Sequence, residues 1–268
     1  MTLFHLFLLA VVQGITEFLP ISSSAHLVLL HELGGPSADA LALDIAVHLG
    51  SIVAVILYFR ADARRAARGT VQLARGQLGT PEAFLALCLL VATVPALILG
   101  GVLALTGWVD LLRNTVIIGW MMIIFGVALW WVHRSAPEAR PAESWTLRHA
   151  VVIGLWQAVA LIPGVSRSGI TMTAARGLGY ERHSAARIAM LMSIPITLAT
   201  GALLSVKVLR SPVGPELLAN AAIAAVLSFV AAYAALALMM RFLSRVSFTP
   251  YVVYRIGLGI VLLWIAYI

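Results

Sequence analysis

The chain has 268 residues, of which 62% are hydrophobic and only 11% are charged, and its mean hydropathy is +1.00. Soluble domains carry about 25% charged residues, so this composition excludes a water-soluble fold and predicts an integral membrane protein. The net charge of +7 fits basic loops that set membrane topology, and we expect no nucleic-acid partner. The single cysteine, Cys88, lies in an apolar run and can form no internal disulfide.

Six apolar stretches are long enough to cross a bilayer, which takes about 20 residues of helix. They are residues 40–60, 82–106, 114–132, 184–207, 216–241 and 249–268. The sequence contains no polar stretch long enough for a separate soluble domain. We therefore predict an all-α integral membrane protein with six transmembrane helices in one membrane domain, residues 1–268.

Two further apolar regions, residues 1–33 and 147–180, are each interrupted by a proline and a serine cluster. The interruptions read FLPISSSAH, from Phe18 to His26, and LIPGVSRSG, from Leu161 to Gly169. The apolar runs on either side are too short to span the membrane. We expect each region to be a re-entrant helical hairpin, with its irregular backbone enclosed by protein or a water-filled cavity.

The order of these elements predicts an inverted-topology repeat, with halves at about residues 1–132 and 147–268. Each half contains a hairpin followed by three spans, and the odd number of spans inverts the second half. Pro20 aligns with Pro163 and Ser23 with Ser166. We therefore expect the hairpins to enter from opposite faces and their tips to meet near the midplane.

Basic residues predict the orientation. Thirteen arginines fall on one predicted face, whereas Arg113, Lys207 and Arg210 fall on the other. The thirteen are Arg60, Arg64, Arg65, Arg68, Arg75, Arg134, Arg140, Arg148, Arg176, Arg182, Arg187, Arg241 and Arg245. By the positive-inside rule the arginine-rich face is cytoplasmic. The first hairpin then opens outward, both termini lie outside the cytoplasm, and Arg255 lies near the inner end of the last span.

Ionisable residues at membrane depth are costly and are functional candidates. The first hairpin contains Glu17 and His26, and Gln13 shares a helical face with Glu17 because the two are four residues apart. The structural alternative is that Gln13 and Glu17 simply bond each other or the partner hairpin.

Three consecutive serines, Ser22, Ser23 and Ser24, follow Pro20. Any one of them can serve as the N-cap of a new helix, whose free N–H groups would bind an anion. His26 lies one turn further on, so its imidazole can reach a hydroxyl and activate it as a nucleophile. Ser23 is the preferred nucleophile and Ser22 the alternative, and direct attack by His26 also remains open.

The second hairpin carries Arg167 between Ser166 and Ser168. The planar guanidinium suits phosphate oxygens, and the two hydroxyls add donors. The structural alternative is an ion pair between Arg167 and Glu17 across the hairpin tips. Thr171 follows on the same segment and is a further candidate for binding phosphate.

Asp44 and His48 are four residues apart at the predicted outer end of the first span. They are candidates for residues that contact the catalytic groups or a metal ion from outside the site. Simple exposure at the membrane interface is an equally good explanation.

QGITEFLPISSSAH (Gln13 to His26) and PGVSRSGIT (Pro163 to Thr171) resemble the signature segments of the bacterial undecaprenyl-diphosphate phosphatase family, also called bacitracin-resistance proteins. The resemblance covers essentially the whole chain. Gln13 stands where Glu is commoner, which removes one potential metal-binding charge. Arg187 stands where many members carry an acidic residue, and we assign it no role.

This resemblance implies hydrolysis of undecaprenyl diphosphate to undecaprenyl phosphate and inorganic phosphate, which recycles the lipid carrier of envelope synthesis and confers bacitracin resistance. It also implies a divalent cation, Mg²⁺ or Ca²⁺, for which Glu17 and Gln13 are the candidate ligands. The implied location is the bacterial inner membrane, with the active site open to the periplasm.

We therefore expect a polyprenyl diphosphate as substrate, with Glu17, Ser23, His26 and Arg167 as catalytic groups. Ser22, Ser24, Ser166, Ser168 and Thr171 would help bind the phosphates. The competing interpretation is a lipid flippase or ion-coupled transporter on the same scaffold. Small residues between Ala219 and Ala237 are compatible with a homodimer.

Overall fold

The computed structural model describes residues 3–34, 39–112, 114–209, 214–243 and 245–268. Within these ranges the regular structure is helical, which confirms the predicted fold class. The helices are α1 (Leu3–Phe18), α2 (Ser23–Gly34), α3 (Ala40–Tyr58), α4 (Arg60–Ala74), α5 (Pro81–Thr106), α6 (Trp108–Leu112), α7 (Thr115–Ser135), η1 (Ala142–Ser144), α8 (Leu147–Val159), α9 (Arg167–Gly177), α10 (Arg182–Leu209), α11 (Pro215–Leu243) and α12 (Thr249–Tyr267).

Six of these helices are long and apolar enough to cross a membrane, namely α3, α5, α7, α10, α11 and α12. They coincide with the six spans predicted from the sequence. Local chemistry sets their ends: Thr80 caps α5 by accepting a hydrogen bond from the Ala83 N–H, and Asn114 caps α7 by accepting one from the Val116 N–H. Gly107 ends α5 in the left-handed conformation.

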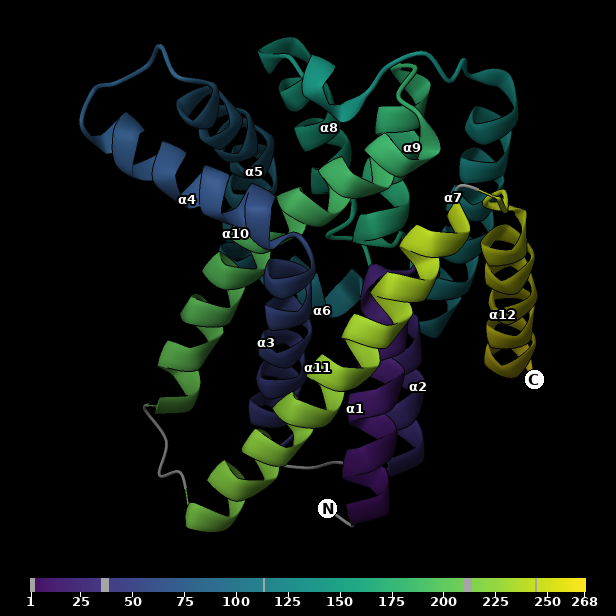
Figure 1. Cartoon of the computed structure of the whole chain (residues 1–268). Coiled ribbons are helices and arrows are strands. Elements are labelled where there is room, and N and C mark those ends of the chain that lie inside the picture. Colours follow the sequence, from purple (N-terminus) through teal and green to yellow (C-terminus); the bar gives the residue numbers. More distant parts are fainter. Residues whose placement is uncertain (1–2, 35–38, 113, 210–213, 244) are drawn as a thin grey trace.

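Two pairs of shorter helices occupy the regions predicted as hairpins. Helices α1 and α2 have 16 and 12 residues, and α8 and α9 have 13 and 11. None approaches the length of about 20 residues that a span requires. In Figure 1 the pair α1–α2 and the pair α8–α9 come from opposite ends of the molecule, and their connecting segments meet near its middle.

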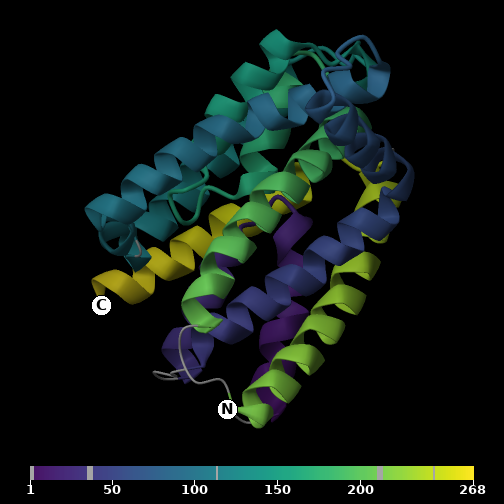
Figure 2. The same cartoon turned by 90° about the vertical axis from the view of Figure 1, so that its left-hand side faces the viewer.

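The hairpin helices of each half pack against long helices of the other half. Helix α1 packs on α11 and α8 packs on α5, while α7 pairs with α12 and α3 with α10. A Cβ atom on Gly14 would lie 2.6 Å from the Ser228 carbonyl oxygen, and one on Gly154 would lie 2.6 Å from that of Ala92. Glycine therefore lets each hairpin approach its long partner helix closely. Figure 2 shows α3 and α11 side by side on another face.

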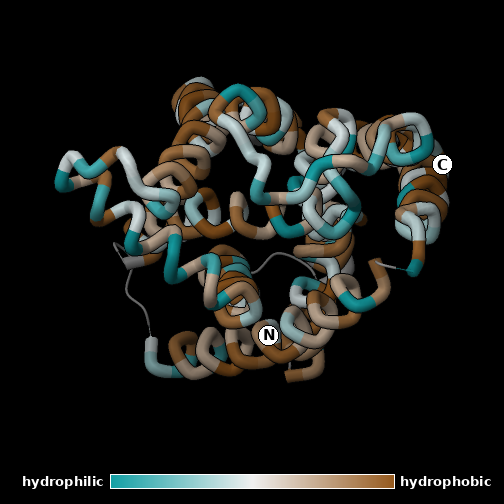
Figure 3. The backbone as a smooth tube through the Cα atoms, turned by 45° about the horizontal axis from the view of Figure 1, so that its top comes forward, coloured by the Kyte–Doolittle hydropathy of each residue, from teal (hydrophilic) through white to brown (hydrophobic). Residues whose placement is uncertain are grey.

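Polar residues concentrate at one end of the bundle. Helix α4 and the connections α7–α8, α9–α10 and α11–α12 lie at this end in Figure 1, and Figure 3 shows hydrophilic residues along them. The largest apolar cluster lies deeper and includes Phe18, next to the first helix break, and Met172, after the second. The two breaks thus meet inside a packed interior and away from the polar end.

Candidate active site

The two helix breaks share an unusual backbone conformation. Ser22 and Ser166 have φ angles of 73° and 70° and are the only non-glycine residues with positive φ in the described part of the chain. A strained positive φ costs a non-glycine residue on the order of 1–3 kcal/mol. Each serine directly precedes the first residue of a helix, Ser23 of α2 or Arg167 of α9. The conformation therefore pairs Ser22 with Ser166, one residue away from the sequence alignment that pairs Ser23 with Ser166.

Glu17 and Arg167 form an ion pair that joins the two breaks. The Nη2 atom of Arg167 donates a hydrogen bond to Oε1 of Glu17, and its Nη1 atom donates to the Thr197 hydroxyl on α10. The side chains of Glu17 and Arg167 are only 7% and 20% exposed. The ion pair that the sequence left open is therefore present, and Thr197 is a partner that the sequence did not reveal.

The second carboxylate oxygen of Glu17 collects the other groups of the first hairpin. Its Oε2 atom accepts hydrogen bonds from Gln13 Nε2 at 2.8 Å and from the Ser23 hydroxyl at 2.7 Å. The Nε2 atom of His48 lies 3.7 Å from the same oxygen. Glu17 is thus the central acceptor of this site, with hydrogen-bond donors from α1, α2 and α9 and the His48 imidazole of α3 nearby.

His26 has different partners from those predicted. Its Nδ1 atom lies 2.8 Å from the main-chain oxygen of Ser22, and its Nε2 atom lies 2.6 Å from the hydroxyl of Tyr254 on α12. A carbonyl oxygen can only accept, so Nδ1 carries the proton. The predicted pairing of His26 with a serine hydroxyl is not present in this arrangement, because the hydroxyl of Ser23 donates to Glu17 and that of Ser22 bonds to Ser24 at 3.0 Å.

The remaining predicted hydroxyls hold the two breaks together. The Ser24 hydroxyl accepts a hydrogen bond from the Gly164 N–H at 3.3 Å, and the Ser168 hydroxyl donates to the Leu19 carbonyl at 2.9 Å. Both contacts run from one hairpin to the other. Ser24 and Ser168 therefore fix the relative position of the breaks.

Ser166 and Thr171 make local contacts on α9. The Ser166 hydroxyl caps the helix by accepting a hydrogen bond from the Gly169 N–H at 3.1 Å, and it lies 3.2 Å from the Ser168 hydroxyl. Thr171 is fully buried, and its hydroxyl donates to the Arg167 carbonyl at 2.8 Å. In this arrangement both hydroxyls satisfy their own helix, and Thr171 does not line an open cavity.

His48 belongs to the site and Asp44 supports it through its backbone. The Nδ1 atom of His48 lies 2.7 Å from the main-chain oxygen of Asp44, one turn earlier on α3. This contact leaves Nε2 directed at Glu17. His48 therefore lies beside Glu17, and Asp44 reaches it through a main-chain contact, while a supporting role for the two residues stays a prediction.

Arg255 is the most deeply buried charge next to the breaks. It is 0% exposed, and its guanidinium donates to the Gly164 and Val165 carbonyls at 3.0 and 2.9 Å and more weakly to that of Pro20 at 3.4 Å. Arg255 thus binds backbone oxygens of both breaks. From the sequence, Arg255 was placed only by its depth in the last span, although a lone arginine in an apolar span indicates a special role.

The oxygen atoms of Glu17 and Gln13 suit a divalent cation whose remaining ligands come from the substrate. The Oε1 atom of Gln13 is buried without a hydrogen-bond partner, and it belongs to the side chain whose Nε2 donates to Glu17. The described residues contain no group of three or more His, Cys, Asp and Glu side chains able to hold a metal ion. Mg²⁺ commonly uses one or two carboxylates together with substrate phosphates, so Glu17 and Gln13 fit a site of that kind.

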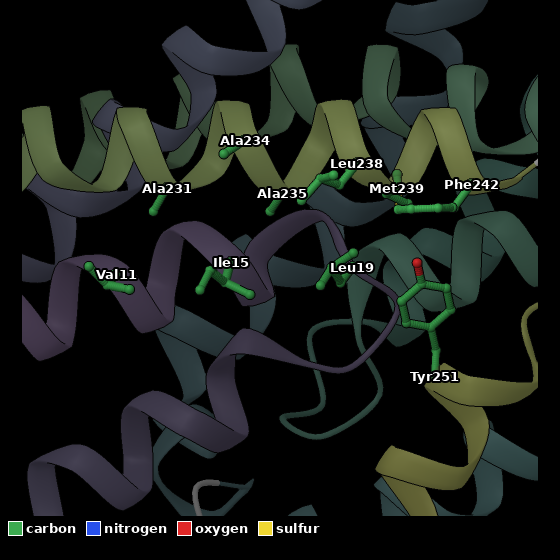
Figure 4. A pocket seen from close by; sticks show the side chains of 10 residues that line it. All are labelled: Val11, Ile15, Leu19, Ala231, Ala234, Ala235, Leu238, Met239, Phe242 and Tyr251. Atoms are coloured by element: carbon green, nitrogen blue, oxygen red, sulfur yellow. The ribbon is translucent and has the colours of Figure 1, made fainter.

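An apolar groove of about 420 Å³ lies behind α1. Figure 4 shows Val11 and Ile15 of α1 and Leu19, just after its end, facing alanines and larger apolar residues of α11, with Tyr251 at one end. Val11, Ile15 and Leu19 recur every four residues, as do Gln13 and Glu17, but the two series are offset by two residues and so face opposite ways. The groove is therefore on the far side of α1 from the carboxylate and is not the polar site.

Fold and site together define a class of protein. It is a helical membrane protein whose two broken hairpins assemble a carboxylate, a guanidinium, hydroxyls and imidazoles at one place in the interior. This set of groups can bind a phosphate ester or anhydride and can supply a nucleophile for it.

The family model described as "Bacitracin resistance protein BacA" matches residues 6–261. The chain is 58% identical to the undecaprenyl-diphosphatase of Dinoroseobacter shibae and 55% identical to that of Roseobacter denitrificans. It is 52% identical to the undecaprenyl-diphosphatase of Ruegeria pomeroyi, and all three alignments cover 100% of both chains. The chain belongs to the bacitracin resistance protein BacA family.

Proposed function

We propose that this protein hydrolyses undecaprenyl diphosphate to undecaprenyl phosphate and inorganic phosphate. The observation that carries the proposal is the contact between Glu17 and Arg167 across the two breaks, with the Ser23 hydroxyl bonded to the same carboxylate. The relatives named undecaprenyl-diphosphatase support an enzyme over a flippase or transporter. The reaction recycles a lipid carrier of envelope synthesis, and resistance to bacitracin follows from family membership.

Arg167 is the proposed phosphate-binding group. Its guanidinium is partly exposed and has a fork geometry that matches two phosphate oxygens. In the free protein Glu17 and Thr197 hold it in place. A diphosphate would take over part of these contacts, and the hydroxyls of Ser22, Ser24, Ser166 and Ser168 are close enough to the breaks to contribute donors.

Ser23 is the proposed nucleophile, and the geometry favours Glu17 as the group that accepts its proton. The Ser23 hydroxyl already donates to Glu17 Oε2 at 2.7 Å. Attack on the terminal phosphorus would form a phosphoserine and release undecaprenyl phosphate, and water would then release inorganic phosphate and restore the hydroxyl. The alternative is attack by His26, which would require its ring to leave Tyr254.

A divalent cation, Mg²⁺ or Ca²⁺, is part of the proposal. Glu17 would hold it, with the unpaired Oε1 of Gln13 as a second oxygen and the substrate's phosphates as the remaining ligands. When bound it would offset the negative charge of the diphosphate. His48 would keep the Glu17 carboxylate oriented from the side of α3.

We further propose that the two halves, residues 1–132 and 147–268, form an inverted repeat in one domain. The matching conformations of Ser22 and Ser166 and the packing of each hairpin against the other half support this. The arginine-rich end would face the cytoplasm of the inner membrane, the site would open to the periplasm, and both termini would be periplasmic. A homodimer through the small residues of α11 completes the proposed arrangement.

Release of inorganic phosphate from undecaprenyl diphosphate by the detergent-purified protein tests the function without a membrane gradient. We expect turnover that a chelator abolishes and that added Mg²⁺ or Ca²⁺ restores. A protein that binds the lipid but releases no phosphate under any of these conditions contradicts the proposal. Accessibility of cysteines introduced at both termini of the chain in intact cells tests the orientation separately.

A further inference from the structure

Helix α4 presents a row of arginines on one face. Arg60, Arg64 and Arg68 of α4 and Arg75, the residue directly after its last turn, are all exposed, and the steps between them place them on a single side of the helix, with Val71 between the last two. Val71 is 50% exposed. This face therefore combines four positive charges with an exposed apolar side chain.

The opposite face of α4 is fixed to the rest of the protein. Asp62 is buried, and Arg187 of α10 donates to both of its oxygens, at 2.8 and 2.7 Å. A Cβ atom on Gly69 would lie 1.9 Å from the Glu82 carbonyl oxygen of α5, so the backbones of α4 and α5 are in close contact. The rotation of α4 is thus set, and the arginine row is held on the outside.

Arg187 is itself secured by a third helix. It donates to Glu143 of η1. The pKa of Glu143 lies below its usual range, because its carboxylate accepts a hydrogen bond from the main-chain N–H of Glu143 and contacts Arg187. Arg187, to which the sequence assigned no role, therefore holds α4 in place.

The four arginines of the row have no compensating acid in the described part of the chain. The acids next to α4 are used elsewhere, since Asp62 pairs with Arg187 and Arg65, and Glu82 with Arg65. Like charges four residues apart destabilise a helix, so Arg60, Arg64 and Arg68 oppose one another. An external anion would relieve this repulsion.

The position of α4 points to the membrane surface as the source of that anion. Only Phe59 separates α4 from the end of α3, and the next span, α5, begins at Pro81. In Figure 1 α4 runs across the end of the bundle at a large angle to α3. A helix that lies across the ends of the spans is at the level of the lipid headgroups.

We propose that the α4 row, Arg60, Arg64, Arg68 and Arg75, binds the headgroups of anionic phospholipids, with Val71 inserted between their acyl chains. Clusters of four or more basic residues on an amphipathic helix at a membrane surface bind anionic lipid electrostatically. This surface is separate from the site at the helix breaks and does not depend on the proposed reaction.

The general topology rule gives a competing explanation. Basic residues at this end orient the protein in the membrane, and for that purpose only their number matters. Lipid binding requires their arrangement in a row. A matched control separates the two, because Arg134, Arg148, Arg241 and Arg245 are also exposed, near the same end, but belong to different segments.

The experiment measures the preference of the protein for spin-labelled phosphatidylglycerol over spin-labelled phosphatidylcholine, as the motionally restricted fraction in lipid nanodiscs. For the unmodified protein we expect a preference of about fivefold, weakened by 1 M salt through charge screening. The variant R60Q/R64Q/R68Q/R75Q should lose nearly all of it. The control R134Q/R148Q/R241Q/R245Q, with the same net charge, should keep most of it.

Equal losses in the two variants would overturn the proposal, and so would an unchanged preference in the α4 variant, which would leave a soluble acidic partner as the explanation of the row. The milder variant R64Q/R68Q should show an intermediate loss and guards against misfolding of the quadruple variant. Phosphate release in detergent reports whether each variant is folded, and a failure of the proposed reaction would leave the lipid measurement intact.

Discussion

The two helix breaks end in the same way, in a serine with positive φ, but their side chains are very different. Each reaches a left-handed serine, Ser22 or Ser166, immediately before a helix begins. The first break then offers hydroxyls and lies beside a carboxylate, whereas the second offers a guanidinium, that of Arg167. In the proposed reaction the first break supplies proton acceptors and a nucleophile, and the second supplies positive charge.

The difference shows that neither hairpin contains all the groups of the candidate active site. A buried carboxylate or a buried guanidinium alone is costly at membrane depth, and each becomes tolerable because the other lies opposite. The chemistry therefore depends on the fold bringing two distant segments together. Predictions that change one break and leave the other intact examine this dependence.

The largest effect is expected from Arg167→Ala. This change removes the guanidinium proposed to bind phosphate and leaves Glu17 buried without its charge partner. Loss of a single preorganised donor typically costs a factor of about 10²–10³, and we expect at least about a thousandfold fall in kcat/KM for phosphate release. The exposed Arg245 supplies the matched control, Arg245→Ala, which should remain near full activity.

Ser23→Ala should lower phosphate release by about a hundredfold or more, because the hydroxyl bonded to Glu17 is the proposed nucleophile. Ser24→Ala, one residue further, should lower it much less, since that hydroxyl contacts the Gly164 N–H and the Ser22 hydroxyl and not the Glu17 carboxylate. Rates and mass-spectrometric detection of a phosphoserine provide the measurement. Full activity in Ser23→Ala with none in His26→Ala would identify the histidine as the attacking group.

Arg255→Met tests how far the two breaks depend on a common anchor. It removes a fully buried guanidinium that binds carbonyls of both breaks. Unsatisfied buried polar groups cost about 1–3 kcal/mol each, so we expect about 2–4 kcal/mol of lost stability, measured by thermal unfolding in detergent. A variant as stable as the unmodified protein would show that the breaks hold their shape without this anchor.

The smallest expected effect is on stability, from changes of Ser22 or Ser166 to glycine, which remove the side chain and relax the backbone. Ser22→Gly and Ser166→Gly should each relieve backbone strain of about 1 kcal/mol. Ser166→Gly also loses the cap on α9, which costs only a few tenths of a kcal/mol. Both variants should therefore be as stable as the unmodified protein or slightly more so in thermal unfolding. Marked destabilisation of only one would show that the two breaks are not equivalent in conformation.

The sequence predicted the spans and the positions of the breaks because both rest on local signals. Apolar length marks a span, and Pro20 or Pro163 followed by serines marks a break. It also identified Glu17 and Arg167 as functional candidates, because charged residues are rare in apolar segments. Partners on distant helices were not predictable: Thr197 and Tyr254 are ordinary residues of apolar spans until folding places them beside Arg167 and His26.

The expected contact between His26 and a serine hydroxyl is not present, for a similar reason. Spacing shows that Ser23 and His26 are one turn apart, but it does not show the left-handed turn at Ser22. That turn directs the Ser22 carbonyl to the imidazole and leaves the Ser23 hydroxyl to Glu17.

A double-mutant cycle on Glu17 and Arg167 tests the composite site most directly. The variants E17Q and R167K and their combination are compared by kcat/KM for phosphate release from undecaprenyl diphosphate. If the two residues act as one unit, the combined loss should be close to that of the worse single variant. Losses that multiply fully would show that they act independently and would contradict the account.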